Sequence, residues 1–517
     1  MIRQSDLWLT AVAALAVILT LGAPLAFGGS VAWAETGLRV LAFLALAVAM
    51  KATAERLASL RPVAVAAAAL GGVALLGLAQ ALPWPAAAVR LVSPEHARLW
   101  EAAAALGTGV DLEDGGEAGT FRLTLAADAS RSAALTWAAA AACLLVGAAL
   151  GAGRSGRERR RWLGAAVLAG AAFQVLYGTR GWFARSNEIW GVAVAGSPSR
   201  LRGTFVNPNH LALFLEIALA LLFAWGWWAA RRVGEEVRPE RRVLLLALPA
   251  LLWLTLFAVL AFTGSRAGLA AALAAVVAQG FLSMGRRRRW LRAGLGIAAA
   301  LAGLGLVAFL GLRQGLGRLL STSSSEVSLD ARRQAWEATL ELWSRFPLFG
   351  SGLGTFRDAF PLVQPRGLAG TWWHAHSDPL ELLATAGLLG GLLVAAGLAV
   401  LVRRLWKVLR QGSRSEDRAA ALAAFGALVA AGLHEMVDFG LTLPANALVL
   451  ALVLGAAAAA RTRPAAAVTG SEQADGARQH PPARQLAQLK EVDSAGEPQR
   501  QGQKPGAGRR RGHRRRH

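Results

Sequence analysis

Residues 231–262 read RRVGEEVRPERRVLLLALPALLWLTLFAVLAF, a cluster of charges followed by twenty residues with none. A helix of about 20 apolar residues crosses the hydrocarbon core of a bilayer, and arginines gather on the cytoplasmic side of such helices. The same alternation recurs along the 517-residue chain, which is 55% hydrophobic and 17% charged. The sequence therefore predicts an all-α, polytopic integral membrane protein.

The apolar runs predict about twelve transmembrane helices. We expect them at 7–27, 34–50, 62–82, 133–152, 163–183, 209–230, 243–262, 267–284, 293–312, 380–402, 419–440 and 444–460. With the N-terminus inside, the arginine-rich connections all fall on the cytoplasmic side. These connections are 51–61, 153–162, 231–242, 285–292 and 403–418. Two long connections then face outward, 83–132 and, between spans nine and ten, the large loop 313–379.

These patterns divide the chain into three parts. Residues 1–160 hold N-terminal transmembrane helices with the outer loop 83–132, and residues 161–460 form a transmembrane core that includes the outer insert 313–379. Residues 461–517 are rich in Pro, Gly and Gln and end in arginines, which predicts a disordered, basic cytoplasmic tail.

The net charge of +23, from 55 basic and 32 acidic residues, does not by itself indicate nucleic-acid binding. Its basic residues lie mostly in the short connections between spans and in the tail, as membrane topology requires. We therefore predict no specific nucleic-acid partner, although the tail can contact anionic lipid or RNA non-specifically. The single cysteine, Cys143, cannot form an intrachain disulfide.

Residues 376–390, HSDPLELLATAGLLG, place a histidine directly before span ten. Asp378 is predicted to be the N-cap, with Pro379 at the first helical position and Glu381 completing a capping box. The free N–H groups of this helix start favour an anion near His376. From the residues alone, His376 is either a capping or interfacial histidine or a general base.

Other polar residues converge on the same outer level, because spans six, eight, ten and twelve all begin there. The candidates are Arg200, Arg202, Asn207, Asn209, Arg266, His374, His376, His434, Glu435 and Asp438. Arginines together with helix N-termini predict a site for a phosphate or diphosphate. Arg266, in the tight turn TGSR at 263–266, is held close to the bilayer, where an ionisable group is by default functional.

Each candidate also has a simpler interpretation. Arg200 or Arg202 alone is an ordinary loop charge, and helix capping explains Asn207 and Asn209 better than substrate binding does. Glu435 and Asp438 can pair with arginines across the bundle. The His374/His376 pair is only a weak signal for a metal site. Trp372 and Trp373 are expected to lie at the membrane interface or to stack on sugars. No phosphate-binding loop, nucleophile elbow, zinc pattern or dinucleotide fingerprint occurs, and Gly352–Gly354 is predicted to be a turn. We predict no metal and no cofactor.

Taken together, these motifs resemble the O-antigen ligase and polymerase superfamily of bacterial envelope proteins. The ligase signature is His, then Asn, Ser or Gln, nine arbitrary residues, Gly, two arbitrary residues, and Gly, Thr or Tyr. His376, Ser377, Gly387 and Gly390 fit it. PLFGSGLGTF (347–356), GTFVNPNH (203–210), TGSR (263–266) and HEMVDFG (434–440) also look like the family, so the resemblance covers about 160–460. Ser377 and Thr385 depart from the Asn and Glu common in the wider superfamily.

The resemblance implies a glycosyltransferase at the periplasmic face of the bacterial inner membrane. Its donor would be an undecaprenyl-diphosphate-linked glycan, and its acceptor lipid A-core or another envelope glycan. A compatible mechanism has Arg266 and one of Arg200 and Arg202 hold the diphosphate while His376 acts as general base, without a metal. We expect His374, Trp373 and His434, with Asn207 and Asn209, to contribute to substrate binding.

Three functions remain open at this point. The first is the ligase. The second is an O-antigen or exopolysaccharide polymerase, whose acceptor is a second lipid-linked repeat unit. A protein O-oligosaccharyltransferase is a close variant of this second function. The third is a flippase for lipid-linked glycan without chemistry. A flippase would carry charges through the middle of several spans, whereas here the charges gather at the outer ends, which favours an enzyme.

Overall fold

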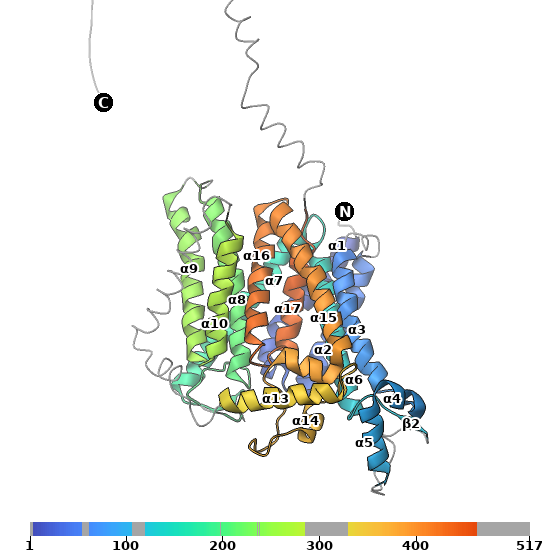
Figure 1. Ribbon diagram of the computed structural model, residues 1–517. Coiled ribbons are helices and arrows are strands. Elements are labelled where there is room, and N and C mark those ends of the chain that lie inside the picture. The colour runs from blue at the N-terminus through green and yellow to red at the C-terminus, as the bar shows by residue number, and fades with distance from the viewer. Residues whose placement is uncertain are drawn as a thin grey trace, which may run out of the picture. The chain divides into compact units, whose positions relative to one another are not determined.

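The computed structural model describes residues 4–53, 61–105, 119–196, 198–234, 236, 238–284 and 329–462 (Figure 1). The predicted span 293–312 and the first part of the insert 313–379 lie outside these residues. So do residues 463–517, which belong to a second unit, Arg463–His517.

Within the described ranges, eleven of the predicted spans coincide with a helix. These are α1 (Gln4–Leu25), α2 (Ala32–Thr53), α3 (Arg61–Gln80), α6 (Ala127–Gly151), α7 (Gly156–Phe183), α8 (Pro208–Arg232), α9 (Pro239–Phe262), α10 (Arg266–Leu282), α15 (Asp378–Gln411), α16 (Ser415–His434) and α17 (Pro444–Ala458). Eight of the described helices, α1 to α3, α6 to α9 and α15, are long and apolar enough to cross a membrane, and α10 and α17 are shorter apolar helices. The predicted fold class is therefore confirmed. Helix α16 ends at His434, six residues before the predicted limit, because the chain turns there to lead into α17.

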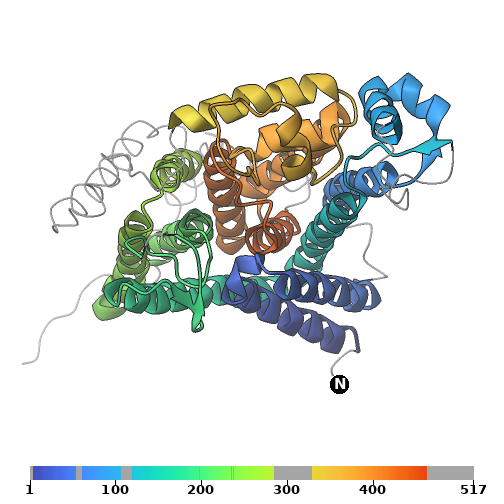
Figure 2. The same ribbon diagram turned by 90° about the horizontal axis from the view of Figure 1, so that it is seen from below.

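The connections between the long helices carry short elements. In the first, β1 (Trp84–Pro85) pairs antiparallel with β2 (Thr120–Phe121), and α4 (Ala86–Val92) and α5 (Pro94–Ala105) lie between them in sequence. A hairpin of β3 (Glu188–Ile189) and β4 (Val192–Ala193) follows α7, and the 3-10 helix η1 (Phe27–Gly29) follows α1. The second insert contains α13 (Leu329–Arg345), α14 (Phe356–Ala359) and the 3-10 helix η4 (Phe360–Leu362). Helix α13, expected from about Leu329 with Pro347 as its stop, lies across the ends of the long helices and packs against α15 (Figures 1 and 2).

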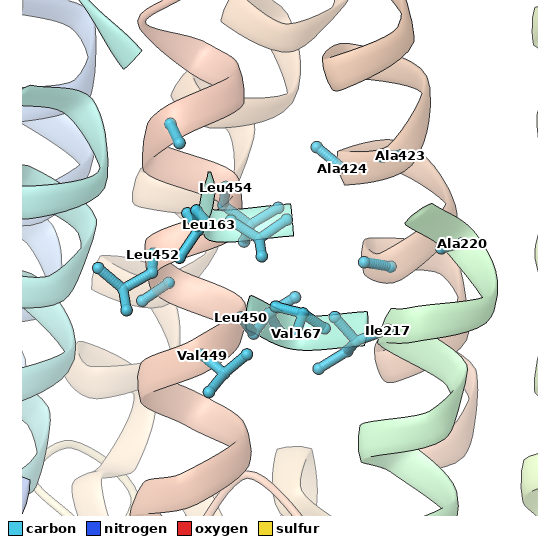
Figure 3. Packing of buried hydrophobic residues seen from close by; sticks show 14 of the residues in the cluster. Leu163, Val167, Ile217, Ala220, Ala423, Ala424, Val449, Leu450, Leu452 and Leu454 are labelled. Carbon is cyan, nitrogen blue, oxygen red and sulfur yellow. The ribbon is translucent and has the colours of Figure 1, made fainter. Parts of the chain in front are cut away.

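Helix α17 forms much of the core, because small residues let neighbouring backbones approach it. A Cβ added at Gly455 would lie 2.0 Å from the carbonyl oxygen of Leu144 in α6, and one at Gly147 would lie 2.2 Å from that of Leu452. Close approach through small residues is typical of helices that pack within membranes. Figure 3 shows leucines of α17 facing Leu163 of α7, with α8 alongside. Helix α17 has only 15 residues, and the surrounding protein buries almost all of them.

Helix α15 is broken at Gly387, which has φ 65° and ψ −169°. The chain from Pro347 to Gly352 docks at this break: Leu388 N–H donates to the Pro347 carbonyl at 2.9 Å, and Gly352 N–H donates to the Thr385 carbonyl at 3.0 Å. A Cβ at Gly387 would lie 2.3 Å from the Leu348 oxygen, so no larger residue fits. The outer insert is thereby attached to the helix that follows His376.

Candidate functional site

His376 lies directly before α15 with a backbone φ of +52°. A residue other than glycine adopts this left-handed conformation at a cost, and it persists where the surroundings fix it. Here the indole N–H of Trp336 in α13 donates to the His376 carbonyl at 3.2 Å. Two residues on, Asp378 N–H donates to the carbonyls of Glu435 and Asp438 at 3.0 and 3.1 Å. The α13 helix and the α16–α17 loop therefore hold this histidine from two sides.

The predicted capping of α15 is wrong in detail. The N-cap is Ser377, without a side-chain cap bond, and Asp378 is the first helical residue. The Asp378 carboxylate instead accepts from the backbone N–H of Leu441 at 3.0 Å, because the α16–α17 loop presents that group to it. Glu381 completes no capping box: its carboxylate accepts from Ala375 N–H at 2.9 Å and lies 3.0 Å from His374 Nδ1.

Phe439 brings three imidazoles together. Its ring stacks on His374, with centroids 4.3 Å apart, and meets the edges of His376 and His210 at 4.8 and 4.9 Å. His210 comes from α8, whereas His374 and His376 precede α15. The sequence analysis included Phe439 and His210 in family-like motifs but assigned neither to the site. Their role in it depends on how the α16–α17 loop folds over α8.

The two histidines before α15 have different protonation preferences. Burial lowers the pKa of His376 to about 4; Asp438 opposes this shift, and Arg332 and His374 add to it. Burial also lowers the pKa of His374, but the Glu381 carboxylate outweighs it, so that pKa is raised above its usual value. His376 is therefore neutral at pH 7, and among the described residues its buried Nδ1 has no hydrogen-bond partner. A neutral imidazole with an unoccupied nitrogen can accept a proton.

Arg332 of α13 is the charged group that the sequence analysis missed. Its guanidinium donates to the Val437 carbonyl at 3.1 Å, while its buried Nε has no hydrogen-bond partner within the described ranges. This contact holds it at the α16–α17 loop, and its charge lowers the pKa of both His376 and Asp438. Ala335 and Thr339 are buried at helical spacing from Arg332, which indicates an inward face of α13, and Ala335 shares an apolar cluster with Ala375 and Ala384.

Arg200 joins the same region through a polar chain. Its Nε donates to the Thr263 carbonyl at 2.7 Å, and its Nη2 donates to the side-chain oxygen of Asn209. The amide of Asn209 in turn donates to the Asp438 carboxylate. Asn207 is the N-cap of α8, as predicted, and accepts from Asn209 N–H at 2.9 Å. Asn209 is therefore a bridge from Arg200 to Asp438 and not a cap.

The contacts of Arg202 go to a different loop. It is buried, and its guanidinium donates to the Ala195 carbonyl at 2.7 Å and to the Asn187 side-chain oxygen at 3.3 Å, beside the β3–β4 hairpin. Burial lowers its pKa. These contacts do not include the His376 cluster.

Arg266 and Trp373 lie at accessible positions. Arg266 is exposed at the first position of α10, whose N-cap is Ser265. Trp373 is 59% exposed, and the guanidinium of Arg357 lies 3.9 Å from the centre of its ring. Either side chain is therefore accessible to a ligand.

His434 is fully buried at the end of α16. Its Nδ1 lies 2.7 Å from Glu216 Oε1 in α8, and its Nε2 lies 3.3 Å from the hydroxyl of Ser265. These contacts tie three helices together next to the turn that carries Arg266, so the geometry gives His434 a supporting position inside the bundle.

The acidic residues of the α16–α17 loop do not show the expected pairing with arginines in the described part of the chain. Glu435 accepts from Gly440 N–H, and burial together with the Asp378 and Asp438 carboxylates raises its pKa well above the usual range. Burial raises the pKa of Asp438 too, but His434, His210 and Arg332 outweigh burial, and the net shift is downward. Asp438 is thus an ionised group facing two histidines and an arginine.

Residues 250–395 match the family model described as O-antigen ligase. This region is O-antigen ligase-like. It contains Arg266, Arg332, His376 and Gly387, while Arg200 lies before it and the α16–α17 loop after it. No curated protein sequence matches the chain. The match supports a membrane enzyme that acts on glycans, of the O-antigen ligase or polymerase type.

Within the described residues, no group of three or more His, Cys, Asp or Glu side chains is arranged to hold a metal ion. The O-antigen ligase-like region does contain a neutral histidine, an arginine beside it and a helix N-terminus after it. This combination suits the transfer of a group from a phosphorylated leaving group to a hydroxyl.

Proposed function

We propose that this protein transfers glycan from an undecaprenyl-diphosphate-linked donor to a hydroxyl of an envelope acceptor, with lipid A-core as the first candidate. The reaction would take place at the periplasmic face of a bacterial inner membrane. The observation that carries the proposal is the placement of His376 within the O-antigen ligase-like region, where α13 and the α16–α17 loop fix it before α15 and no described group bonds its Nδ1.

In this mechanism His376 is the general base. The acceptor hydroxyl attacks the anomeric carbon of the donor sugar and gives its proton to the imidazole, while the bond from that carbon to the diphosphate oxygen breaks. Undecaprenyl diphosphate leaves with the bonding electrons, and His376 then releases the proton to water. A single displacement of this kind inverts the anomeric centre. The unpartnered Nδ1 supports this role, because no hydrogen bond from the described residues occupies this nitrogen, which is free to take up a proton.

The leaving group gains negative charge, so cations must face it. Arg332 supplies one guanidinium with an unused buried Nε, and Arg200 is oriented by Thr263 and Asn209. Arg266 supplies a third from the N-terminus of α10. Arginines bind phosphates through paired N–H groups, which supports a mechanism without a metal. The contacts of Arg202 with the β3–β4 loop support a structural role for that residue instead.

Aromatic and polar side chains around His376 suit a sugar. Trp373 is exposed and presents a ring face, and Phe439 is half-buried beside His374. We propose that Trp373 and His374 contact the glycan. A polymerase would use the same donor site and differ in the acceptor, so the identity of the acceptor distinguishes the two.

The test uses the purified full-length protein with undecaprenyl-diphosphate-linked glycan and two acceptors supplied separately, lipid A-core and a second lipid-linked glycan. We expect glycan to move to lipid A-core, seen as a gel shift and by mass spectrometry. Elongation of the lipid-linked glycan alone would assign a polymerase and contradict the ligase. No transfer to either acceptor by correctly folded protein would contradict both.

Arg332→Gln tests the diphosphate contact, and Arg333→Gln is its matched control. Arg333 neighbours it in sequence, but its side chain is 66% exposed and lies 3.7 Å from Asp330 and 3.8 Å from Glu337. Loss of one donor to a developing anion costs roughly 10²–10³ in kcat. We expect that loss for Arg332→Gln and near-normal transfer for Arg333→Gln. Equal rates in the two variants would remove Arg332 from the mechanism.

A further inference from the structure

A second cluster of arginines lies at the other end of α15. The part of the helix after its break at Gly387, residues 388–411, spans about 36 Å at a rise of 1.5 Å per residue. Beyond its last residue, a small pocket of about 50 Å³ lies between the α6–α7 turn, the α15–α16 turn and the end of α17. Its lining includes Arg154, Arg157, Arg160, Arg414, Arg461 and Asp417. We propose that this pocket binds the phosphate group of an anionic phospholipid.

The pocket has more positive charge than its own acid can neutralise. Five arginines face one carboxylate, Asp417. That carboxylate is already engaged, because it forms a buried ion pair with Arg160 and accepts from the Ser413 hydroxyl at 2.8 Å. Arg160 also donates to the Gly151 carbonyl at 2.7 Å. Asp417 and Arg160 thus neutralise each other's charge within the protein.

The other four arginines form no ion pair in the part of the chain that the structure describes, and Glu416, whose charge also acts on Arg157, pairs with Arg161 and Arg232. Within the described residues, no side-chain hydrogen bond or ion pair involves Arg154, Arg157, Arg414 or Arg461. Like charges held together repel one another, and an anion between them removes that repulsion. A phosphate oxygen is the acceptor that guanidinium groups match best. The charge pattern therefore indicates an anion of phosphate type.

The walls of the pocket are fixed by the backbone. Ser413 N–H donates to the Arg461 carbonyl at 3.0 Å, and Gly412 forms a β-bridge with Thr462. Across the α6–α7 turn, the side chain of Arg159 in α7 donates from Nε to the Leu150 carbonyl in α6 at 3.1 Å. The three segments that present the arginines are thus held in place without a ligand, and a site formed in advance binds with less loss of entropy.

A lipid is favoured over a free phosphate because the same end of the helices carries aromatic residues paired with arginines. Arg410 lies 4.2 Å from the ring of Trp406, and Arg231 lies 4.5 Å from that of Trp227. Trp406 is 43% exposed, and Trp162, close to the pocket in α7, is 44% exposed. Exposed tryptophans at the ends of spans mark the headgroup level of a bilayer. A basic pocket at that level meets phospholipid headgroups.

Thermal unfolding of the purified full chain in detergent, followed by tryptophan fluorescence, tests this assignment. Phosphatidylglycerol, phosphatidylcholine and inorganic phosphate are titrated separately. The pocket variant is Arg154→Gln/Arg414→Gln. The control is Arg238→Gln/Arg241→Gln, which removes the same charge from two exposed positions outside the pocket. Native mass spectrometry counts the lipid retained by the folded fraction of each protein, so a loss of stability is not mistaken for a loss of binding.

We expect phosphatidylglycerol to raise the unfolding midpoint and to remain bound, with no such effect from phosphatidylcholine or inorganic phosphate. The pocket variant should need at least about tenfold more phosphatidylglycerol for the same shift, whereas the control matches the wild type. Equal weakening in both variants would show a bulk charge effect and overturn the proposal. A shift reproduced by inorganic phosphate, or by phosphatidylcholine, would overturn the assignment to an anionic lipid.

Discussion

At the scale of single residues, the chemistry assigned to His376 depends on its surroundings. The residue type and its place before a helix were evident from the sequence, and so was the N-cap role of Asn207. The contributions of Arg332 and Phe439 were not, because both depend on tertiary contacts. Arg332 reaches the site from α13 and Phe439 from the α16–α17 loop. The local sequence of these two segments does not indicate which elements they pack against.

The pH dependence of the reaction tests the environment of His376. Burial lowers its pKa to about 4, and a general base is active only in its neutral form. We therefore expect kcat/KM for transfer to be level near neutral pH and to fall in acid with an apparent pKa near 4. Arg332 helps to lower that pKa, so Arg332→Gln should move the acid limb to higher pH. A wild-type limb at or above the ordinary histidine value of about 6.5 would contradict this environment.

At the scale of elements, the break in α15 explains why the motif that follows His376 has glycine at position 387. A positive φ at Gly387 admits the chain from Pro347 to Gly352, and the hydrogen bonds across the break attach the outer insert. The sequence predicted the span and the glycine turn at 352–354, which is confirmed by positive φ values at Gly352 and Gly354. It did not predict that this turn docks on the helix itself, because that contact joins segments about 33 to 41 residues apart.

Gly387→Ala tests that docking. The added Cβ would lie 2.3 Å from the Leu348 oxygen on a backbone with positive φ, and we expect a loss of about 1–3 kcal/mol in stability together with reduced transfer. Gly391→Ala is the matched control, since its Cβ would meet only the flexible end of Leu383 at 3.0 Å. Chemical unfolding in detergent measures both. Equal stability of the two variants would show that the break is not required.

At the scale of the whole molecule, the sequence predicted most of the helices because their composition is set by the bilayer. Hydropathy and arginine clusters indicate where a span begins and ends, whatever its neighbours are. The limit of α16 was missed because the chain leaves the helix at His434 to build the loop around Asp378. Packing of α17 against α6 through glycine was likewise not evident from hydropathy.

Orientation is a prediction at this scale, and thiol labelling in intact cells tests it. The sole cysteine, Cys143, is 1% exposed, so it gives little background. Asp128→Cys introduces a thiol on the predicted outer side, where the native side chain is 89% exposed, and Ser155→Cys introduces one in the exposed α6–α7 turn. A membrane-impermeant maleimide should label the first in intact cells and the second only after lysis. The reverse pattern would place His376 on the cytoplasmic side.

The rate at which purified protein releases undecaprenyl diphosphate from its lipid-linked donor, in the presence of acceptor, tests the central claim most directly. His376→Gln keeps a polar side chain of similar size but cannot act as the base. With the unfolding midpoint unchanged, we predict a rate roughly 10²–10⁴ times lower than that of the wild type. A folded His376→Gln protein that releases undecaprenyl diphosphate at the wild-type rate would contradict general-base catalysis by this histidine.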